Sequence, residues 1–295
     1  MMHSTIFGGL QYVDFETSMN LAAYPQLLQQ DQTSQRLGIP GVQVLNFFKS
    51  LYERHNFLKI KPQHESRIPK IIHQIWIGDA VPQKFKQFQE SWLKLHPDWE
   101  YRLWTSHDLP LFAWHNADLL SKSRNPGEIS DIMRYEILYT YGGVYIDFDF
   151  ECLQALDELN RLYDFYIGIQ PLDCELVQLG IGLIGSVAGH PILKAAIENL
   201  HAAWHEAANQ GNAPAKTGPL YFTKIFLNTA GNAEYCDVAL PAHYFYPLAC
   251  TQEELLYDMW IEQGAFGVHH WAKSWLLPSF RKKKFQELKV QDLPE

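Results

Sequence analysis

The chain has 295 residues, of which 47% are hydrophobic and 14% aromatic, enough to bury the core of one large domain or of one domain with an appendage. Its formal net charge of −9 argues against nucleic acid as a main partner and suits a protein that needs a cation to hold an anionic ligand. We interpret the four cysteines, which lack zinc-ligand spacing, as reduced thiols of a cytosolic chain: Cys152, Cys174, Cys236 and Cys250. We identify no signal peptide, and no run of about 18 apolar residues predicts a membrane span.

Residues 1–66 differ from the rest of the chain. They are rich in glutamine, and the segment "VQVLNFFKSLYERHNFL" at 42–58 carries apolar residues at helical spacing. We predict a helical appendage with a packing role, and binding of an acceptor or a partner is the alternative. The charged residues 282–295 predict a peripheral tail.

Two strands and a helix are predicted next. The β-branched run "IPKIIHQIWIG" at 68–78 indicates a buried strand, with Trp76 near its end. Residues 81–97, "VPQKFKQFQESWLKLHP", have helical spacing, and "WEYRLWT" at 99–105 predicts a second strand. The stretch from 106 to 123 is predicted as helix or loop.

A helix is predicted over residues 128–143, with Ser130 as its N-cap and the glycine pair at its end. Asp131 and Arg134 lie three residues apart and therefore share one side of this helix. A surface ion pair worth under about 1 kcal/mol is the plain interpretation of the two residues.

The segment "YGGVYIDFDF" at 141–150 predicts a strand in which Tyr145, Asp147 and Asp149 face one way and the apolar residues the other. Two carboxylates on one face favour a hard divalent cation between them, and a solvated pair is the alternative. The alternation of strand and helix predicts a mostly parallel sheet covered on both faces, with its ligand at the carboxyl ends of the strands, where both aspartates fall.

Four segments together carry a family resemblance: "IPKIIHQIWIG", "SDIMRYEILYTYGGVYIDFDF", "TGPLYFT" and "HHWAKSW". In this order the chain resembles the DxD sugar transferases that include the fungal initiating α-mannosyltransferases and bacterial capsule and lipooligosaccharide enzymes. The catalytic domains of the large glucosylating toxins are more distantly similar. The resemblance covers about residues 68–275 and implies a GT-A-type α/β catalytic domain, which we place at 67–281.

The resemblance also implies a nucleotide-sugar donor, a divalent cation (manganese or magnesium) and retention of the anomeric configuration. It makes Asp149 the first metal ligand, with Asp147 touching the metal and ribose. His269 is implied as a third ligand, with His270 as the alternative. A metal at this place neutralises the leaving diphosphate, which is what sugar transfer requires.

Further residues take roles by resemblance. Asp131 and Arg134 are expected to hold the donor sugar, and the guanidinium also approaches the phosphate. The remaining substrate-binding candidates are Trp76 for the base, Tyr145 for the ribose or sugar, the turn Thr217, Gly218 and Pro219 for the acceptor side, and Ser274 with Trp275 over the diphosphate. Core packing is the alternative for Trp76 and Trp275. Gln178 and Gly180 stand where relatives often have an asparagine, which leaves donor identity open.

The sequence therefore predicts a metal-dependent retaining hexosyltransferase that uses UDP-glucose, UDP-galactose or GDP-mannose. The acceptor is a hydroxyl of a glycan, of a lipid-linked saccharide or of a protein. A metal-dependent nucleotide-sugar hydrolase and a non-catalytic binder are the alternatives. The expected location is cytoplasmic, with a membrane-peripheral or secreted-effector setting left open.

Overall fold

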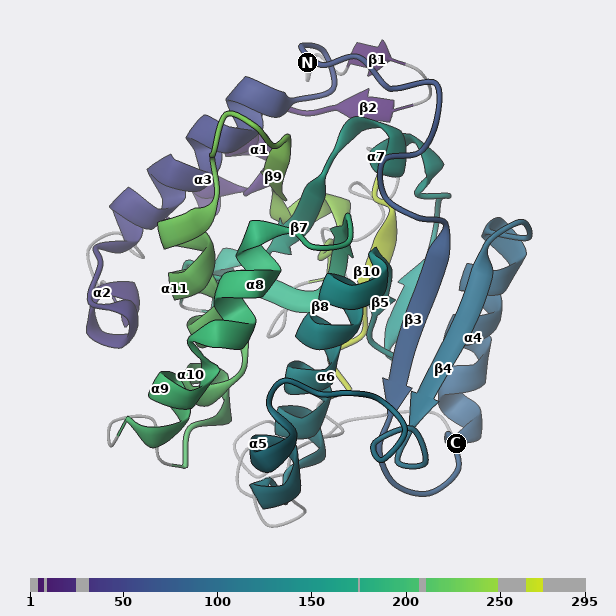
Figure 1. Cartoon of the computed structure of the whole chain (residues 1–295). Helices are drawn as coiled ribbons and strands as arrows, with labels where there is room; N and C mark the ends of the chain where they lie inside the picture. Colours follow the sequence, from purple (N-terminus) through teal and green to yellow (C-terminus); the bar gives the residue numbers. More distant parts are fainter. Residues whose placement is uncertain are drawn as a thin grey trace, which may run out of the picture.

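The computed structural model describes residues 5–7, 10–24, 32–174, 176–206, 211–248 and 264–272 (Figure 1). Its strands are β1 (Thr5–Phe7), β2 (Leu10–Tyr12), β3 (Ile71–Trp76), β4 (Glu100–Thr105), β5 (Gly143–Ile146), β6 (Phe150–Cys152), β7 (Phe165–Ile169), β8 (Leu179–Ser186), β9 (Asp237–Leu240) and β10 (Gly267–His269). Its α-helices are α1 (Phe15–Ser18), α2 (Gln32–Leu37), α3 (Gly41–His55), α4 (Gln83–Leu95), α5 (Ala117–Lys122), α6 (Pro126–Tyr141), α7 (Asp157–Leu162), α8 (Pro191–Glu198), α9 (Leu200–His205), α10 (Ala213–Lys216) and α11 (Pro219–Thr229). Short 3₁₀ turns are η1 (Leu21–Ala23), η2 (Leu172–Cys174) and η4 (Ala242–Tyr244).

A six-stranded sheet with the order β4-β3-β5-β8-β7-β9 forms the centre of the molecule. Its β3–β4, β3–β5 and β7–β9 pairs are parallel, whereas β8 runs antiparallel to both of its neighbours. The predicted mostly parallel α/β fold is confirmed, with one reversed strand that the sequence reasoning did not identify. Between β7 and β8 the described residues form only a 3₁₀ turn, and a connection without a crossover helix joins antiparallel strands.

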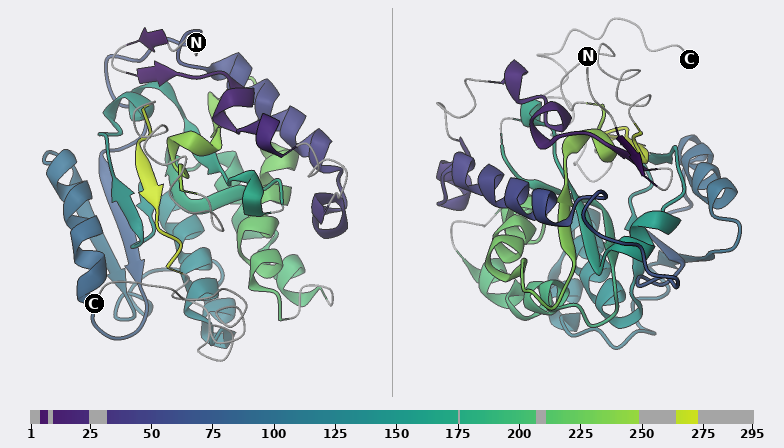
Figure 2. Two further views of the ribbon diagram at one scale, coloured as in Figure 1. Left: turned by 180° about the vertical axis from the view of Figure 1, so that it is seen from behind. Right: turned by 90° about the horizontal axis from the view of Figure 1, so that it is seen from above.

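Helices cover both faces of the sheet, as the front view (Figure 1) and the rear view (Figure 2, left) show. On β4, Tyr101 accepts a 2.6 Å hydrogen bond from Gln89 of α4, whereas the ring of Trp104 packs 5.8 Å from Tyr141 of α6. Residues three apart on a strand point to opposite faces, so α4 and α6 lie on opposite sides. Strands β6 and β10 form a separate antiparallel pair that contacts α4.

The described residues up to the end of α3 contribute to the core of the sheet domain. Helix α3 packs along the edge strand β9, and Phe48 and Tyr52 are completely buried there. The Tyr52 hydroxyl donates to the carbonyl of Val13 at 2.6 Å and lies 2.9 Å from the Tyr244 hydroxyl. The helices predicted in this region are present, and the β1–β2 hairpin before them was not predicted.

The N-terminal boundary of α6 differs from the prediction. The helix begins at Pro126, and its N-cap is Asn125, whose side chain accepts a 2.9 Å hydrogen bond from the amide of Gly127. Ser130 is therefore not the N-cap but lies inside the helix. The Asn-Pro pair is the stronger start signal, because proline at the first helical position loses no hydrogen bond.

The strand predicted through Asp149 is also wrong, because β5 ends at Ile146. Residues 147–149 form a turn that is closed by a 3.2 Å hydrogen bond from the amide of Phe150 to the carbonyl of Asp147. The chain then enters β6 and pairs with β10. The two aspartates thus belong to a turn between strands of different sheets, and not to one face of a strand.

Two further predictions concern the cysteines and the possibility of a membrane span. Among the residues described, Cys152 and Cys236 are free thiols. The described helices include none with both the length and the apolar character that a membrane span requires.

Candidate active site

Helix α6 carries a buried ion pair. Asp131 and Arg134 are 8% and 4% exposed, and their side chains approach to 3.1 Å. The sequence left open whether this is a surface pair, and the burial excludes that interpretation. Because both charged groups are out of water, removing either would leave the other without compensation.

The guanidinium of Arg134 is held from several sides. Its Nη1 donates to the carbonyl of Ile181 at 2.7 Å, and its Nη2 donates to Ser130 Oγ at 3.2 Å. The ring of Tyr145 lies 4.3 Å from the guanidinium carbon. Burial by itself lowers the pKa of Arg134, but Tyr145 and the nearby carboxylates outweigh it, so the pKa is raised. The side chain is therefore a permanent cation in one orientation.

Asp131 receives a second contact from a distant part of the chain. Thr217 Oγ1 donates to Asp131 Oδ2 at 2.8 Å. Burial raises the pKa of Asp131 to about 6, although Arg134 and Thr217 oppose the rise. Gly218 follows at the N-cap of α11, and a Cβ there would lie 2.9 Å from the Cα of Pro214 and 3.3 Å from Asp131 Oδ2. This close approach requires a glycine, and Pro219 then begins the helix.

Asp147 lies directly after β5. The Tyr145 hydroxyl donates to its Oδ1 at 2.5 Å, and Arg134 Nη2 lies 3.5 Å from the same oxygen. Burial raises the pKa of Asp147, and the charge of Arg134 opposes the rise. On the other side the carboxylate meets Gly182 of β8, where a Cβ would lie 2.9 Å from Oδ2.

Asp149 is fixed by the last described segment of the chain. His269 Nε2 lies 3.2 Å from Oδ1, and the amide of Ala272 donates to Oδ2 at 2.7 Å. Burial would raise the pKa of Asp149, but His269 and Ala272 outweigh it and lower the pKa to about 2. The carboxylate is thus ionised over the physiological range. Trp271, between these two contacts, has a φ of 50°, a left-handed conformation that is unusual for a bulky residue.

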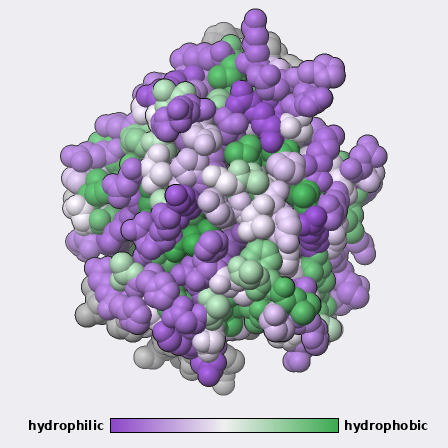
Figure 3. All heavy atoms as spheres, in the orientation of Figure 1, coloured by the Kyte–Doolittle hydropathy of each residue, from purple (hydrophilic) through white to green (hydrophobic). Residues whose placement is uncertain are grey.

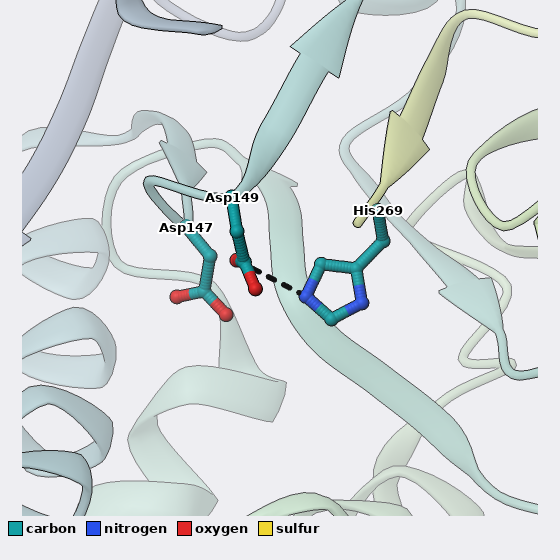
Figure 4. A group of neighbouring side chains, drawn as sticks. All are labelled: Asp147, Asp149 and His269. Atoms are coloured by element: carbon teal, nitrogen blue, oxygen red, sulfur yellow. Dashed lines mark ion pairs between the residues drawn. The ribbon is translucent and has the colours of Figure 1, made fainter. Parts of the chain in front are cut away.

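The three side chains Asp147, Asp149 and His269 converge, and each offers a ligand atom within 4.8 Å of the other two (Figure 4). Two carboxylates and an imidazole form a donor set that suits manganese, and the carboxylates suit magnesium. The His269 Nδ1 is buried and has no hydrogen-bond partner, whereas Nε2 faces Asp149. The residues present therefore fit a divalent cation.

His270 points elsewhere. Its Nε2 lies 2.9 Å from Glu151 Oε2, and its ring stacks on Phe88 with a centroid distance of 4.4 Å. The ring of His269, in contrast, packs against Phe150, Tyr246 and Trp271 beside the two aspartates. Of the two adjacent histidines, His269 is the one that reaches the carboxylates.

The other predicted substrate residues lie as follows. Trp76 ends β3 and is half-buried, with its ring 5.5 Å from Phe85 and 5.3 Å from Phe148 in the turn between the two aspartates. Tyr145 is buried, and its side chain contacts Asp147, Arg134 and Ser130. Ser274 and Trp275 lie outside the described residues.

Sequence reasoning missed four contributors to the site. Ser130 contacts both Arg134 and Tyr145, and the carbonyl of Ile181 orients the guanidinium. Gly182 makes room for Asp147, and the ring of Tyr246 packs beside His269. The available sequence signal was the pair of glycines at alternate positions of "LGIG", because glycine within a strand often marks the close approach of another group. In the structure, a Cβ on Gly180 would overlap the Tyr246 hydroxyl.

Comparison with known proteins finds a family match for one segment of the chain. Residues 82–166 match the family described as a glycosyltransferase sugar-binding region containing a DXD motif. The match includes α6 and the turn with Asp147 and Asp149.

Two curated fungal proteins are similar to the chain. One is inositol phosphoceramide mannosyltransferase 3 of Schizosaccharomyces pombe, 30% identical over 72% of this chain and 63% of its own. The other is a mannosyl phosphorylinositol ceramide synthase of Saccharomyces cerevisiae, 33% identical over 56% of this chain and 43% of its own. The chain thus matches less than two thirds of either relative's length.

Among solved structures, the PaToxG glycosyltransferase is similar, with a TM-score of 0.48 and 17% identity over 65% of this chain and 79% of its own.

Proposed function

We propose that this chain transfers a hexose from a nucleotide sugar to a hydroxyl group. The proposal starts from the region that matches the family of glycosyltransferase sugar-binding regions containing a DXD motif. The observation that carries the proposal is the convergence of Asp147, Asp149 and His269 beside the buried cation of Arg134. A nucleoside diphosphate leaves only if its growing negative charge is neutralised, and a cation bound by the three ligands would act there as a Lewis acid. Manganese or magnesium is the proposed metal.

The protein groups around this centre have complementary tasks. Arg134 is positively charged and already oriented, so it stabilises charge on the diphosphate without reorganisation. Asp131, oriented by Thr217, accepts hydrogen bonds from hydroxyls of the donor sugar. Trp76 offers a half-buried ring to the base. Ser274 and Trp275, outside the described residues, stay candidates for contact with the diphosphate. Tyr145 and Ser130 hold Asp147 and Arg134 in place.

For the donor and acceptor, the names of the relatives favour one choice among those that the sequence left open. Both fungal relatives are named for mannose and for an inositol-phosphate ceramide lipid. We therefore propose GDP-mannose first, with UDP-glucose and UDP-galactose as the other donors. We propose a lipid headgroup hydroxyl as the acceptor, ahead of a glycan or protein hydroxyl.

Retention of the anomeric configuration is supported by how the site carboxylates are engaged. Asp131 contacts Arg134 and Thr217, Asp147 contacts Tyr145 and Arg134, and Asp149 contacts His269 and Ala272. An inverting reaction would need a free carboxylate base on the acceptor side. With these three engaged, the leaving diphosphate is the proposed proton acceptor, on the same face as the attack.

We further propose that residues 67–281 form the catalytic unit, with residues 1–66 packed against it and residues 282–295 as a peripheral tail. The proposed location is the cytoplasm, at a membrane surface or as a secreted effector.

The test is a donor screen with the purified chain and manganese, using GDP-mannose, UDP-glucose and UDP-galactose in turn. Acceptors are a phosphoinositol lipid in detergent and a soluble glycan. Proton NMR of the new linkage should show an α-anomer, and a β-anomer would refute retention. Release of free sugar at one rate with and without acceptor would instead establish the hydrolase alternative.

A further inference from the structure

The loop between β4 and α5 carries six consecutive apolar residues, Leu109 to Trp114, and none of them is buried. Leu111 is 81% exposed, the largest value among the exposed large hydrophobic residues of the described chain. Figure 3 shows a hydrophobic area over the lower end of β4 and the loop that follows it. Three of the six are exposed (Pro110, Leu111 and Ala113), and the other three are half-buried. Scattered single apolar residues on a surface are ordinary, but a contiguous exposed apolar patch marks an interaction site.

The loop is held firmly at both ends. At its start, the amide and hydroxyl of Thr105 donate to Asp108 Oδ2 at 2.7 and 2.9 Å. At its end, the amides of His115 and Asn116 donate to the Glu136 carboxylate of α6 at 2.6 and 2.9 Å. Between the two ends, Phe112 packs against Trp104, Trp114 and Tyr141. The exposed apolar residues are thus held in place by hydrogen bonds at both ends of the loop and by the packing of Phe112.

Many of the polar groups of the loop are satisfied within it. The amides of Leu111 and Phe112 donate to the carbonyl of Asp108, and that of Trp114 donates to the carbonyl of Phe112. Pro110 has no amide hydrogen, and Trp114 Nε1 donates to the carbonyl of Leu109 at 2.7 Å. A backbone enters hydrocarbon cheaply only when its hydrogen bonds are already made. The amides of Leu111, Phe112 and Trp114 meet that condition within the loop.

The loop leaves the sheet beside the candidate active site. It begins directly after Thr105, the β-ladder neighbour of Trp76, and the Trp76 ring contacts Phe148 between the two aspartates. An acceptor that is itself a membrane lipid requires the enzyme to sit at the bilayer surface.

We propose that residues 109–114 form a membrane-contact surface, with Leu111 and its neighbours inserting among lipid headgroups and upper acyl chains. The proposal rests on the proposed function, because the lipid acceptor in the names of the fungal relatives is what favours a bilayer over a protein partner. A projecting apolar tip needs no complementary pocket in a fluid bilayer, and aromatic rings such as that of Trp114 are favoured at its interface. The run contains no charge, so the binding is hydrophobic.

The experiment is flotation of the full chain with phosphatidylcholine vesicles at low and high salt. The variants are Leu111→Asp and a matched control, Leu58→Asp, which places the same charge at a residue that is 44% exposed in the turn after α3. We expect the wild-type chain and the control to float with the vesicles at both salt concentrations. Leu111→Asp should bind about tenfold less. Its donor hydrolysis should be unchanged, because Leu111 lies outside the site.

Three results would overturn the proposal: no flotation of the wild-type chain, equal losses in the two variants, or loss of binding at high salt. Analytical ultracentrifugation adds a fourth, since a self-association that Leu111→Asp abolishes would make the patch a contact between two copies of the chain. Absence of donor turnover in every variant would count against the proposed function alone, because flotation does not depend on catalysis.

Discussion

Thr217 Oγ1 donates a 2.8 Å hydrogen bond to Asp131 across 86 positions of the chain. It joins the turn between α10 and α11 to the face of α6 that also carries Arg134. Asp131 thereby has one oxygen toward Thr217 and the other toward Arg134. The segments "SDIMRYEILYTYGGVYIDFDF" and "TGPLYFT", which are far apart in the sequence, are therefore in direct contact.

This contact predicts the behaviour of a Thr217→Val variant, which keeps the shape of threonine but cannot donate. A hydrogen bond to a charged group contributes about 1.5–3 kcal/mol, so we expect kcat/KM to fall roughly 10- to 100-fold. Affinity for the free nucleoside diphosphate, measured by calorimetry, should change little, because Asp131 is assigned to the sugar. Thr217→Ser should restore most of the activity, and failure of this rescue would show that the methyl group matters instead.

The metal site predicts opposite outcomes for two adjacent histidines. His269→Ala removes a ligand, so manganese affinity measured by calorimetry should fall at least tenfold. His270→Ala should retain it, because that ring pairs with Glu151 and stacks on Phe88. Equal losses in both variants would contradict the assignment. In the unchanged protein, excess chelator should abolish turnover and leave the circular dichroism spectrum intact.

A substitution at Arg134 can test the charge of this side chain separately from its hydrogen-bonding geometry. Arg134→Lys keeps one positive charge but cannot reach Ile181, Ser130 and the two carboxylates together. We expect kcat to fall about 100-fold or more, with nucleoside diphosphate affinity within about threefold of the wild-type value. A loss of nucleoside diphosphate affinity as large as the loss of kcat would show that Arg134 acts in binding the nucleotide and not in stabilising the charge that grows as the diphosphate leaves. Urea denaturation provides the control for folding.

His73 predicts how the stability of the fold depends on pH. Its Nε2 lies 2.9 Å from the carbonyl of Gly142, and its Nδ1 accepts from Trp104 Nε1 at 3.1 Å, so the site holds a neutral ring. Burial lowers the pKa of His73 to about 4, below the value of about 6.5 in the unfolded chain. The unfolded state therefore binds more protons between these pH values, and stability is lost as the pH falls through this window.

The loss attributable to His73 is on the order of 3 kcal/mol at most. Urea denaturation at pH 7 and pH 5 should show a smaller pH difference for His73→Gln than for the wild-type chain. A His107→Gln control, in an exposed loop, should keep the wild-type difference. Identical pH differences in the wild-type chain and His73→Gln would refute the assignment.

Local patterns were enough to identify much of this molecule. The β-branched run ending near Trp76 and the helical spacing of residues 81–97 predicted β3 and α4, because period and burial are written into neighbouring residues. The Asp-Phe-Asp motif after an apolar strand indicated where two carboxylates meet. Two local details were wrong: the N-cap at Ser130 and the strand through Asp149. The reversed direction of β8 was not predicted.

What only the tertiary structure decided are the contacts between segments distant in the chain. Spacing cannot show that Thr217 meets Asp131, that His269 and not His270 reaches Asp149, or that Gly182 leaves room for Asp147. These relationships depend on the order and direction of strands in two sheets, which follow from the packing of the whole core. The sequence by itself therefore determined the chemical groups available, and the fold determined which of them meet, because side chains hundreds of atoms apart along the chain become neighbours only when the core closes.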